Sequence, residues 1–474
     1  MRLLFGLIMA LSEDEFARLS TLRLKGKQLA VMTMMFNARK NGEPPTDEAV
    51  ANINTTSTHL YEMCSVLLAR SLEFLVPQGG VAILEFVANK NLKIAFKQEL
   101  LKQTQRIDPQ NQKAKEDFYL SAFELIFRQT YSVVDFDLGV KYGDLYIHSK
   151  RNYSIEDKMA VEARKTIHQL VGSLADSRRY LKDSEELGNQ LKGYESAVRN
   201  STHPYFCYTV YSGLAWYSQH VLGKPDMNLR YLQRATVFAE KLDNYVFREL
   251  EVEMKLRIAD AQFALGATEE ALEIYERAFR MARPDSLLWK RNYFLLRYLD
   301  ILIYHGKYFQ AEEILKKYYE PMLRLAPSTT SATASCLFAI LYLLSGKYDE
   351  SKKYLDTAFK LNRRTNYTAY NDIRNRIVRA ALSYITGDWD ETDHTTRTTM
   401  TYLYSRDLGL SRHSVGYYFK IIDALIILFK EGKPLSRKNE TKFIELTHPK
   451  EGLMGLILKK VRATNAKPQA KAKS

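Results

Sequence analysis

The chain has 474 residues, of which 46% are hydrophobic and 26% charged, an ordinary composition for a folded, water-soluble protein. Its 21 glycines and 12 prolines are too few for the many turns of an all-β fold, and they favour long helices with short connections. The formal net charge is +14, but six basic residues lie in the last sixteen positions, and the +8 of the remaining 458 residues does not indicate a nucleic-acid-binding protein.

The N-terminal run from Arg2 to Leu11 has the charge and apolar character of a short signal peptide, but no A-x-A cleavage site precedes Ser12. Ser12 and Glu15 instead form a capping-box pattern, which predicts the start of a helix. No stretch reaches the roughly 20 apolar residues of a membrane-spanning helix. The three cysteines lie far apart and form no disulfide framework, as expected in a reducing compartment. We therefore expect a cytoplasmic protein, with export as the alternative.

The first 131 residues are predicted to form a helical region of their own. Hydrophobic periodicity places helices at residues 13–40, 47–53, 57–76, 81–106 and 114–131. Pro44-Pro45 separates the first of these helices from the second. The turn residues from Pro77 to Gly80 separate the third from the fourth.

Two of these helices have the spacing of a helix-turn-helix, with Thr46–Ile53 first and Ser57–Leu75 as the recognition helix. The polar residues Ser57–His59 are placed where such a helix contacts base edges. Phosphate contacts dominate DNA affinity, however, and Arg70 is the one basic residue of this helix. The sequence favours an ordinary packed helix, whose core face would consist of Leu60, Met63, Cys64, Leu67, Leu68 and Leu75.

A lysine cluster follows on the helix predicted at residues 81–106. Lys90, Lys93 and Lys97 fall at i, i+3 and i+7 and therefore share one face. This face offers a basic patch for an acidic partner, RNA or DNA. A solvated helix face is the commoner meaning of such a pattern, and the sequence leaves both interpretations open.

Residues 132–204 are predicted to connect this region to the rest of the chain. Two glycines and several β-branched residues within 132–153 predict a connector or an irregular hairpin. The segment 154–198 has the apolar periodicity of one or two long helices.

The C-terminal half contains an internal repeat marked by glycines at positions 266, 306, 346 and 387, spaced 40, 40 and 41 residues apart. Five positions after each glycine stands a small residue: Ala271, Ala311, Ser351 and Thr392. Nine positions after it stands a large one in three copies: Tyr275, Leu315 and Leu355. Glycine can adopt the left-handed conformation that ends a helix, and the small residue lets the next helix pack closely. The spacing therefore predicts a stack of helix hairpins.

This pattern resembles the tetratricopeptide repeat, which also has a small residue at the twelfth position, here Ala278 and Ala358. The period of 40 exceeds the usual 34, and Tyr318 and Thr399 depart from the small twelfth residue. The resemblance covers residues 205–435 and implies an all-α fold whose repeats, expected over 205–458, form a right-handed α-α superhelix. It also implies a non-enzymatic scaffold that binds a peptide or a partner protein on its concave face.

The concave face of such an array is lined by the helices that precede each glycine, expected here at residues 251–265, 287–305, 330–345 and 370–386. The last of them carries the candidate partner-binding residues, Tyr370, Arg374, Asn375, Arg376 and Arg379. These residues predict a basic groove for an acidic peptide, or else a solvated outer face.

No catalytic or metal-binding motif is recognisable, so we expect no enzyme activity, no cofactor and no metal site. Residues 459–474 have no bulky anchor after Val461 and predict a disordered basic tail. An alternative function is a transcriptional regulator or another nucleic-acid-binding protein, with a helix-turn-helix-like N-terminal part and a helical-repeat sensor. That layout is similar to the layout of some bacterial regulators.

Overall fold

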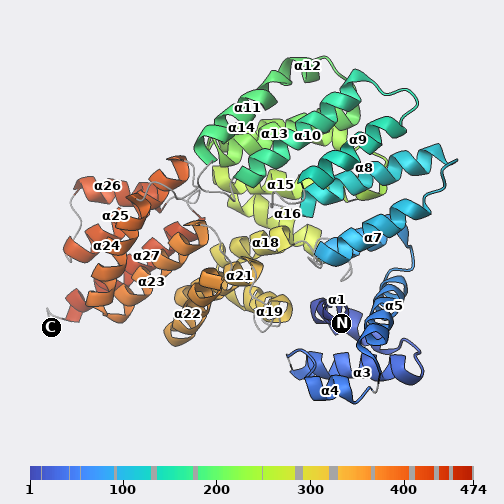
Figure 1. Ribbon diagram of the computed structural model, residues 1–474. Helices are drawn as coiled ribbons and strands as arrows, with labels where there is room; N and C mark the ends of the chain where they lie inside the picture. The colour runs from blue at the N-terminus through green and yellow to red at the C-terminus, as the bar shows by residue number, and fades with distance from the viewer. Residues whose placement is uncertain are drawn as a thin grey trace. The chain divides into compact units, whose positions relative to one another are not determined.

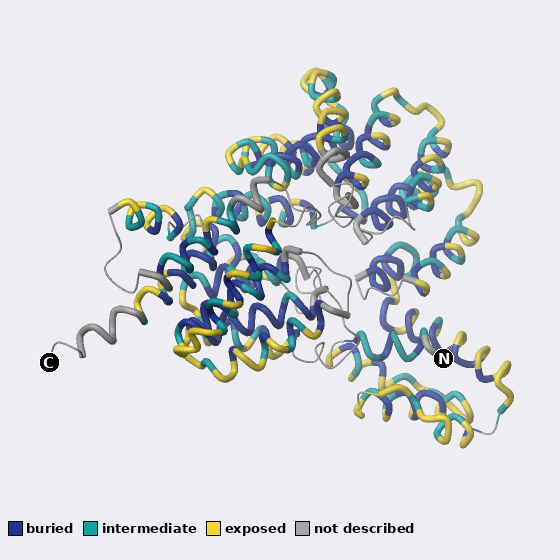
Figure 2. The backbone as a smooth tube through the Cα atoms, turned by 60° about the vertical axis from the view of Figure 1, so that its left-hand side comes forward, coloured by how far each residue is buried: buried dark blue, intermediate teal, exposed yellow. Residues whose placement is uncertain are grey.

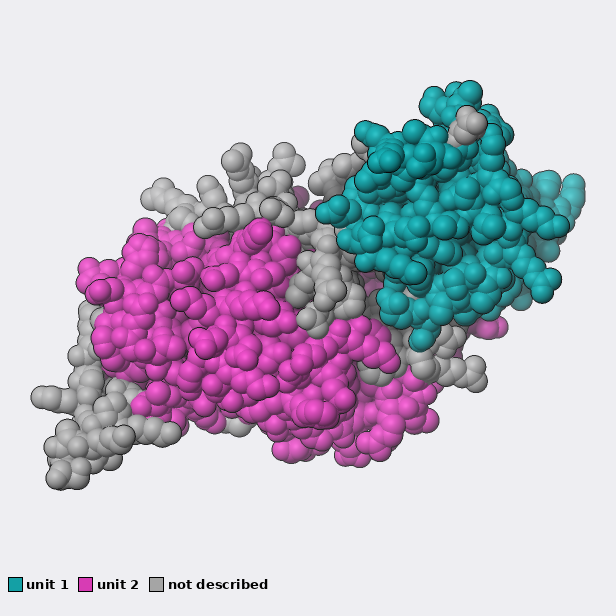
Figure 3. Space-filling model, turned by 90° about the horizontal axis from the view of Figure 1, so that it is seen from below, with its two compact units in different colours: residues 1–154, 244–248 teal, residues 155–243, 249–474 magenta. Residues whose placement is uncertain are grey.

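The computed structural model describes residues 1–11, 13–41, 43–53, 55–89, 93–129, 136–173, 180–247, 249–282, 292–319, 329–364, 369–404, 412–431, 437–447 and 452–471. Within these ranges every regular element is a helix (Figure 1), which confirms the expected all-α fold. The chain divides into two compact units, residues 1–154 with 244–248 and residues 155–243 with 249–474 (Figure 3). Figure 2 shows buried positions along the helices of each unit and exposed positions on outer faces and turns.

The first unit is built from short and medium-length helices. They are α1 (Arg2–Ala10), α2 (Glu13–Ser20), α3 (Gly26–Asn41), α4 (Asp47–Ala51), α5 (Ser57–Leu75), α6 (Gly80–Asn89), α7 (Lys93–Arg106), α8 (Gln112–Gln129), α9 (Phe136–Ser149) and the 3-10 turn η2 (Tyr245–Phe247). The segment 244–248 belongs here because Asn244 Nδ2 donates to the carbonyl oxygen of Asp117 at 3.3 Å and Ser121 Oγ donates to Asn244 Oδ1 at 2.9 Å.

Three predictions for this unit need correction. The helix expected at 13–40 is two helices, since Gly26 begins α3 with a φ of +54°. The helix expected at 81–106 is likewise divided into α6 and α7. Part of the connector expected at 132–153 is the helix α9, and its Gly139 serves close packing rather than a turn. A Cβ on Gly139 would lie 2.4 Å from Cε1 of Phe127 on α8, so only glycine permits this approach of the two helices.

The second unit contains the repeats. Its helices are α10 (Ile155–Ser173), α11 (Tyr180–Gly193), α12 (Glu195–Arg199), α13 (Pro204–His220), α14 (Pro225–Ala239), α15 (Leu250–Leu265), α16 (Thr268–Met281), α18 (Asn292–Tyr304), α19 (Tyr308–Tyr318), α21 (Thr329–Ser345), α22 (Tyr348–Arg364), α23 (Ala369–Thr386), α24 (Trp389–Tyr404), α25 (Arg412–Glu431), α26 (Arg437–Leu446) and α27 (Gly452–Lys471). Consecutive helices pack as hairpins, namely α13–α14, α15–α16, α18–α19, α21–α22, α23–α24 and α25–α26. We call the first helix of each hairpin its A helix and the second its B helix.

The four repeat glycines end their A helices in one conformation. Their φ angles are +96°, +70°, +84° and +80° at positions 266, 306, 346 and 387. At Gly346 the glycine N–H donates to the carbonyl of Leu343, and the N–H of Lys347 donates to the carbonyl of Tyr342 at 2.8 Å. The other three glycines have the same pair of bonds, which is the Schellman motif. The predicted left-handed helix ends are therefore confirmed.

The small residues after the glycines pack as the repeat pattern predicts. Ala271, Ala311 and Ser351 are fully buried, and Thr392 is 1% exposed. Ser351 Oγ also donates to the carbonyl oxygen of Ala339 at 2.8 Å, which joins B helix α22 to A helix α21. The expected A helices correspond to α15, α18, α21 and α23, although residues 287–291 lie outside the described part of the chain.

The end of the chain differs from the disordered tail expected from residue 459. Helix α27 continues to Lys471, and its Val461 is fully buried. The apolar residues from Leu453 to Val461 anchor this helix, and the polar residues after them continue it without large side chains. Residues 472–474 lie outside the described part of the chain.

We expect Gly346→Ala to lower the free energy of unfolding by about 1 kcal/mol, because an L-residue is strained in the left-handed conformation. A Cβ at this position meets no atom within 4 Å, so the loss reflects conformation alone. Urea denaturation followed by circular dichroism measures it. The control is Gly193→Ala at the end of α11, where a Cβ also meets nothing and no positive φ is required. Equal losses in the two variants would contradict the explanation.

Candidate protein-binding groove

The A helices of the second unit form a face that is covered by another helix of the same chain. Helix α27 packs against α18, α21, α23 and α25, all of which are A helices. Its Gly452 also lies beside the ring of Phe263 on α15. We call the surface of these five helices that faces α27 the A-helix face.

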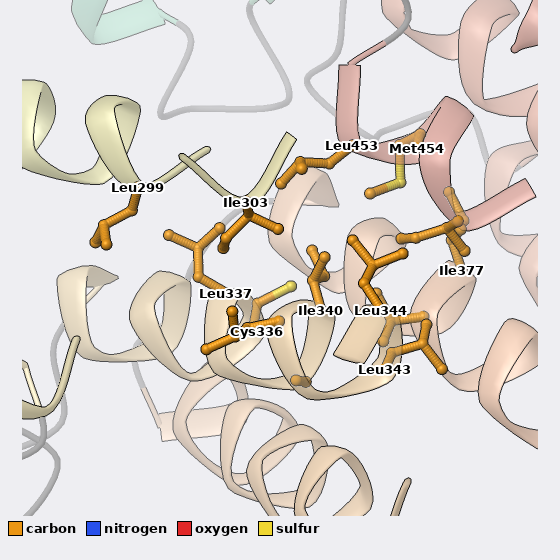
Figure 4. Packing of buried hydrophobic residues seen from close by; sticks show 14 of the residues in the cluster. Leu299, Ile303, Cys336, Leu337, Ile340, Leu343, Leu344, Ile377, Leu453 and Met454 are labelled. Atoms are coloured by element: carbon orange, nitrogen blue, oxygen red, sulfur yellow. The ribbon is translucent and has the colours of Figure 1, made fainter. Parts of the chain in front are cut away.

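An apolar stripe on α27 makes the contact. The stripe consists of Leu453, Met454, Ile457, Leu458 and Val461, each no more than 7% exposed. These positions fall at i, i+1, i+4, i+5 and i+8, which places them on one side of a helix. Figure 4 shows Leu453 and Met454 in one cluster with Ile303 of α18, Ile340 and Leu344 of α21, and Ile377 of α23.

Helix α21 shows how completely the face is covered. From Ser331 to Leu344 every residue is buried except Thr333, which is half-buried and accepts a hydrogen bond from Asn371 at 3.0 Å. A helix that is apolar on all sides must have neighbours on all sides. Helices α18, α19, α22 and α23 surround α21 within the stack, and α27 covers the remaining side.

Beside this apolar surface lies a row of alternating charges, which we call the acid–arginine ladder. It consists of Asp260 on α15, Arg297 and Asp300 on α18, and Arg374 on α23. Arg297 Nε donates to Asp260 Oδ1 at 3.1 Å, and its Nη1 donates to Asp300 Oδ2 at 3.3 Å. Arg374 Nη2 lies 3.5 Å from Asp300 Oδ1. The hydroxyl of Tyr275 donates to Asp260 at 2.8 Å and completes the row.

Sequence reasoning missed this ladder, although a signal was present. The pattern Arg-x-x-Asp occurs at Arg257–Asp260 and again at Arg297–Asp300, one repeat period of 40 residues later. Charged residues recurring with the repeat occupy equivalent places on adjacent A helices. The pattern was thus sufficient to predict charges side by side on this face.

The predicted basic residues of α23 each have a carboxylate partner within the unit. Arg374 is 7% exposed and pairs with Asp300. The Nε atom of Arg376 lies 2.7 Å from Asp372 Oδ2, and the Nε atom of Arg379 lies 2.5 Å from Glu391 Oε1. An acidic peptide would have to displace these carboxylates. The buried Arg374 therefore has a structural role, and the basic groove expected from these residues stays a prediction.

The other two predicted residues of this site do not add to a basic groove. Asn375 is fully buried, and neither amide atom has a hydrogen-bond partner among the described residues. Tyr370 lies in the first turn of α23, and its side chain is outside the described part.

The predicted lysine patch is only partly described. Lys97 is half-buried on α7, Lys93 begins α7 with its side chain outside the described part, and Lys90 lies outside it altogether. Their common basic face stays a prediction.

The two helices of the predicted helix-turn-helix are α4 and α5. Thr46 and Thr56 cap them by accepting the backbone N–H of Ala49 and His59 at 3.2 and 3.3 Å. All six residues predicted for the core face of α5 are buried, which confirms the packed helix. Arg70 donates to Gln28 of α3 at 2.8 Å. Asn54 of the turn lies outside the described part.

Within the described ranges, no three His, Cys, Asp or Glu side chains gather closely enough to hold a metal ion. No single described helix is long and apolar enough to cross a membrane. Helix α5 together with Gly80–Ala88 of α6 meets that test by length and composition, as a pair bent by 105°. The α6 residues Ala82, Ile83, Leu84 and Val87 are buried within the first unit, as expected of a core helix.

Comparison with known proteins identifies two repeats. Residues 252–285 and 332–365, which contain the hairpins α15–α16 and α21–α22, match the family model described as Tetratricopeptide repeat. The resemblance inferred from the glycine pattern is confirmed for these segments. No curated protein sequence matches the chain significantly.

Solved structures show a distant overall likeness. A Signal Transduction ATPase with Numerous Domains protein with a tetratricopeptide repeat sensor, from Pyrococcus horikoshii, is 12% identical with a TM-score of 0.40, over 85% of this chain and 63% of that protein. Aspartyl phosphate phosphatase F from Bacillus subtilis is 12% identical with a TM-score of 0.41, over 79% of this chain and 94% of that protein. The chain thus spans less than two thirds of the first protein, and similarities of this size carry no conclusion about function.

Arg374 and Arg379 of α23 differ in burial, which predicts unequal contributions to stability. We expect Arg374→Met to lower the free energy of unfolding by about 3 kcal/mol, because it leaves the largely buried Asp300 without one of its two cations. Arg379→Met should cost less than about 1 kcal/mol, because both side chains of the Arg379–Glu391 pair are partly exposed to solvent. The side chains are 9% exposed for Arg374 and 41% for Arg379. Urea denaturation of the two variants measures both losses in the free energy of unfolding. Equal losses would exclude the structural role assigned to Arg374.

Proposed function

We propose that the chain is a non-enzymatic scaffold that binds a protein partner on the A-helix face of its second unit. Tetratricopeptide repeats generally bind proteins, and two such repeats, α15–α16 and α21–α22, contribute their A helices to this face. The observation that supports the proposal most directly is α27, which lies across α18, α21, α23 and α25. Its position demonstrates that this face has the length and the apolar character needed to hold a helix.

The partly exposed charged side chains on the same A helices, beside the A-helix face, supply polar contacts. The side chains of Arg257 and Arg297 are 34% and 28% exposed, and those of Asp260 and Asp300 are 12% and 18% exposed. Fixed charges of alternating sign select partners by orientation and by charge, because a like charge placed opposite them is repelled. We infer that the apolar part of the face contributes affinity and that the ladder contributes specificity.

A cytoplasmic location is part of the same proposal. Cys64, Cys207 and Cys336 are all free and buried, which is the usual state of cysteines in a reducing compartment.

The nucleic-acid-binding alternative has less support. The exposed start of α5, Ser57–His59, carries no arginine or lysine, and Arg70 already donates to Gln28. Since phosphate contacts dominate affinity for a duplex, this helix lacks the charges that DNA binding requires.

Two matched substitutions in one hairpin test which side of the array binds. Arg257 on A helix α15 pairs with Glu253 at 2.6 Å, and Arg277 on B helix α16 pairs with Glu273 at 2.8 Å. Both are i, i+4 pairs of arginine and glutamate, and both substitutions reverse a charge. The Glu253 side chain is 8% exposed and that of Glu273 is 71% exposed, so the folding of Arg257→Glu has to be verified before its binding is compared. We expect Arg257→Glu to reduce partner recovery at least about tenfold through like-charge repulsion, and Arg277→Glu to leave it unchanged.

Recovery is measured by affinity capture with the full chain and quantitative mass spectrometry, after circular dichroism has shown that both variants are folded. Loss of the same partners from both variants, or from Arg277→Glu alone, would refute binding on the A-helix face.

A further inference from the structure

Helix α27 occupies the surface on which the proposed function places a partner. It does more than cap the final hairpin α25–α26, because it reaches across α23 and α21 to α18. Gly452 extends this contact to Phe263 of α15. A partner helix could not lie along the same A helices while α27 is in place.

We propose that α27 is an exchangeable internal ligand, and that the A-helix face binds a partner helix with the same apolar spacing once α27 leaves. This inference rests on the proposed function and adds to it the class of partner and the regulation of the site. The partner is an amphipathic helix with Leu, Ile, Met or Val in the register of Met454, Ile457, Leu458 and Val461, which fall at i, i+3, i+4 and i+7. Helix-in-groove recognition uses anchors at this spacing.

The charge beside the stripe specifies one further feature of the partner. Arg462 Nη2 lies 2.8 Å from Glu440 Oε1 on α26, and its guanidinium stands 5.1 Å from the centre of the Phe443 ring. An arginine or lysine in the register of Arg462 would make the same two contacts. The partner helix should therefore carry a cation one position after its last apolar anchor.

The attachment of α27 is suited to exchange. Among its described side chains, Arg462 is the one that forms an ion pair with another helix, and this pair is 44% and 35% exposed. Exposed ion pairs contribute little, so the apolar stripe supplies most of the attachment. A partner helix with an equivalent apolar stripe would make the same apolar contacts with the A-helix face. Four hairpins, by contrast, are each held by a Schellman turn: α15–α16, α18–α19, α21–α22 and α23–α24.

Cys336 provides a reporter that needs no substitution. It is fully buried on α21 in the cluster that contains Leu453 and Met454 (Figure 4). Burial raises the pKa of its thiol to about 11. Alkylation near neutral pH therefore requires the cluster that Cys336 shares with Leu453 and Met454 to open. Cys207 is equally buried in the same unit on α13, away from this cluster, and reports unfolding of the array.

The first experiment alkylates the unmodified full chain with a maleimide under native conditions and measures each cysteine by mass spectrometry. If α27 leaves while the array stays folded, Cys336 reacts at least about tenfold faster than Cys207, as expected for a local opening. Equal rates for the two cysteines would mean that α27 leaves only on unfolding, and that result would overturn the proposal.

The second experiment uses a fluorescent peptide with the sequence of residues 452–471 and measures its anisotropy. The Leu458→Glu full chain should bind the peptide at least about tenfold more tightly than the unmodified chain, in which the competent state is a small fraction. The control is Ala463→Glu, which places the same charge at an exposed position of α27 and should behave like the unmodified chain. A peptide carrying the Ile457→Glu change should bind neither.

Three results of the peptide experiment would overturn the proposal. The first is absence of binding to Leu458→Glu while Cys207 stays protected. The second is equal binding to Leu458→Glu and Ala463→Glu. The third is a dimer of the unmodified chain that the peptide dissociates, because α27 would then be exchanged between two copies rather than for a partner.

If Leu458→Glu exposes Cys207, the variant is unfolded and the alkylation rates of the unmodified chain decide instead. Because α27 covers the face in the unmodified chain, the capture experiment is also run with the Leu458→Glu chain. If the peptide binds Leu458→Glu but neither chain captures a protein, the proposed function is refuted and the exchange of α27 stands. If the unmodified chain captures partners that Arg257→Glu loses while Cys336 and Cys207 react at equal rates, the exchange is refuted and the proposed function stands.

Discussion

The arrangement of the second unit depends on one backbone conformation, the left-handed glycine that ends each of four A helices. With φ between +70° and +96°, the glycine and the residue after it donate to carbonyls near the end of the A helix and stop it. The chain then reverses into a B helix, whose buried small residue allows the two helices to lie close together. Because the reversal is the same at each glycine, successive A helices come to lie side by side, as α18 and α21 do, and α21 and α23. The A-helix face is a consequence of that repetition.

Local patterns were the part of this structure that the sequence could predict. The glycine conformation depends on a few adjacent residues, and the spacing of small and large residues reflects contacts within one hairpin. The same holds for α5, where the helical period placed six residues on the core face and all six are buried. Such features depend on periodicity along the chain, which a single sequence displays directly.

Features that depend on which helices become neighbours were not predictable in the same way. Three arginines on α23 suggested a basic groove, but their partners include Asp300, which lies two hairpins earlier in the chain. Gly139 suggested a turn, because nothing in the local sequence indicates that the ring of Phe127 lies against it. In both cases the role of the residue depends on a side chain that is distant in sequence or lies on another helix, and only the fold brings the two together.

Two A helices, α15 and α21, differ in a way that indicates the covering role of α27, which was not predicted from the sequence. Helix α15 carries Arg257 and Asp260, which are partly exposed, as expected of an A helix that faces solvent on one side. Helix α21 has no charged residue from Thr329 to Ser345, although an A helix in an uncovered array needs one polar side. An A helix without a polar side therefore requires a further element to cover it. The apolar residues from Leu453 to Leu458, followed directly by lysines and Val461, are the segment in this chain that meets that requirement. The polar residues after Val461 suggested a disordered tail. The apolar residues before them form the helix that covers α21.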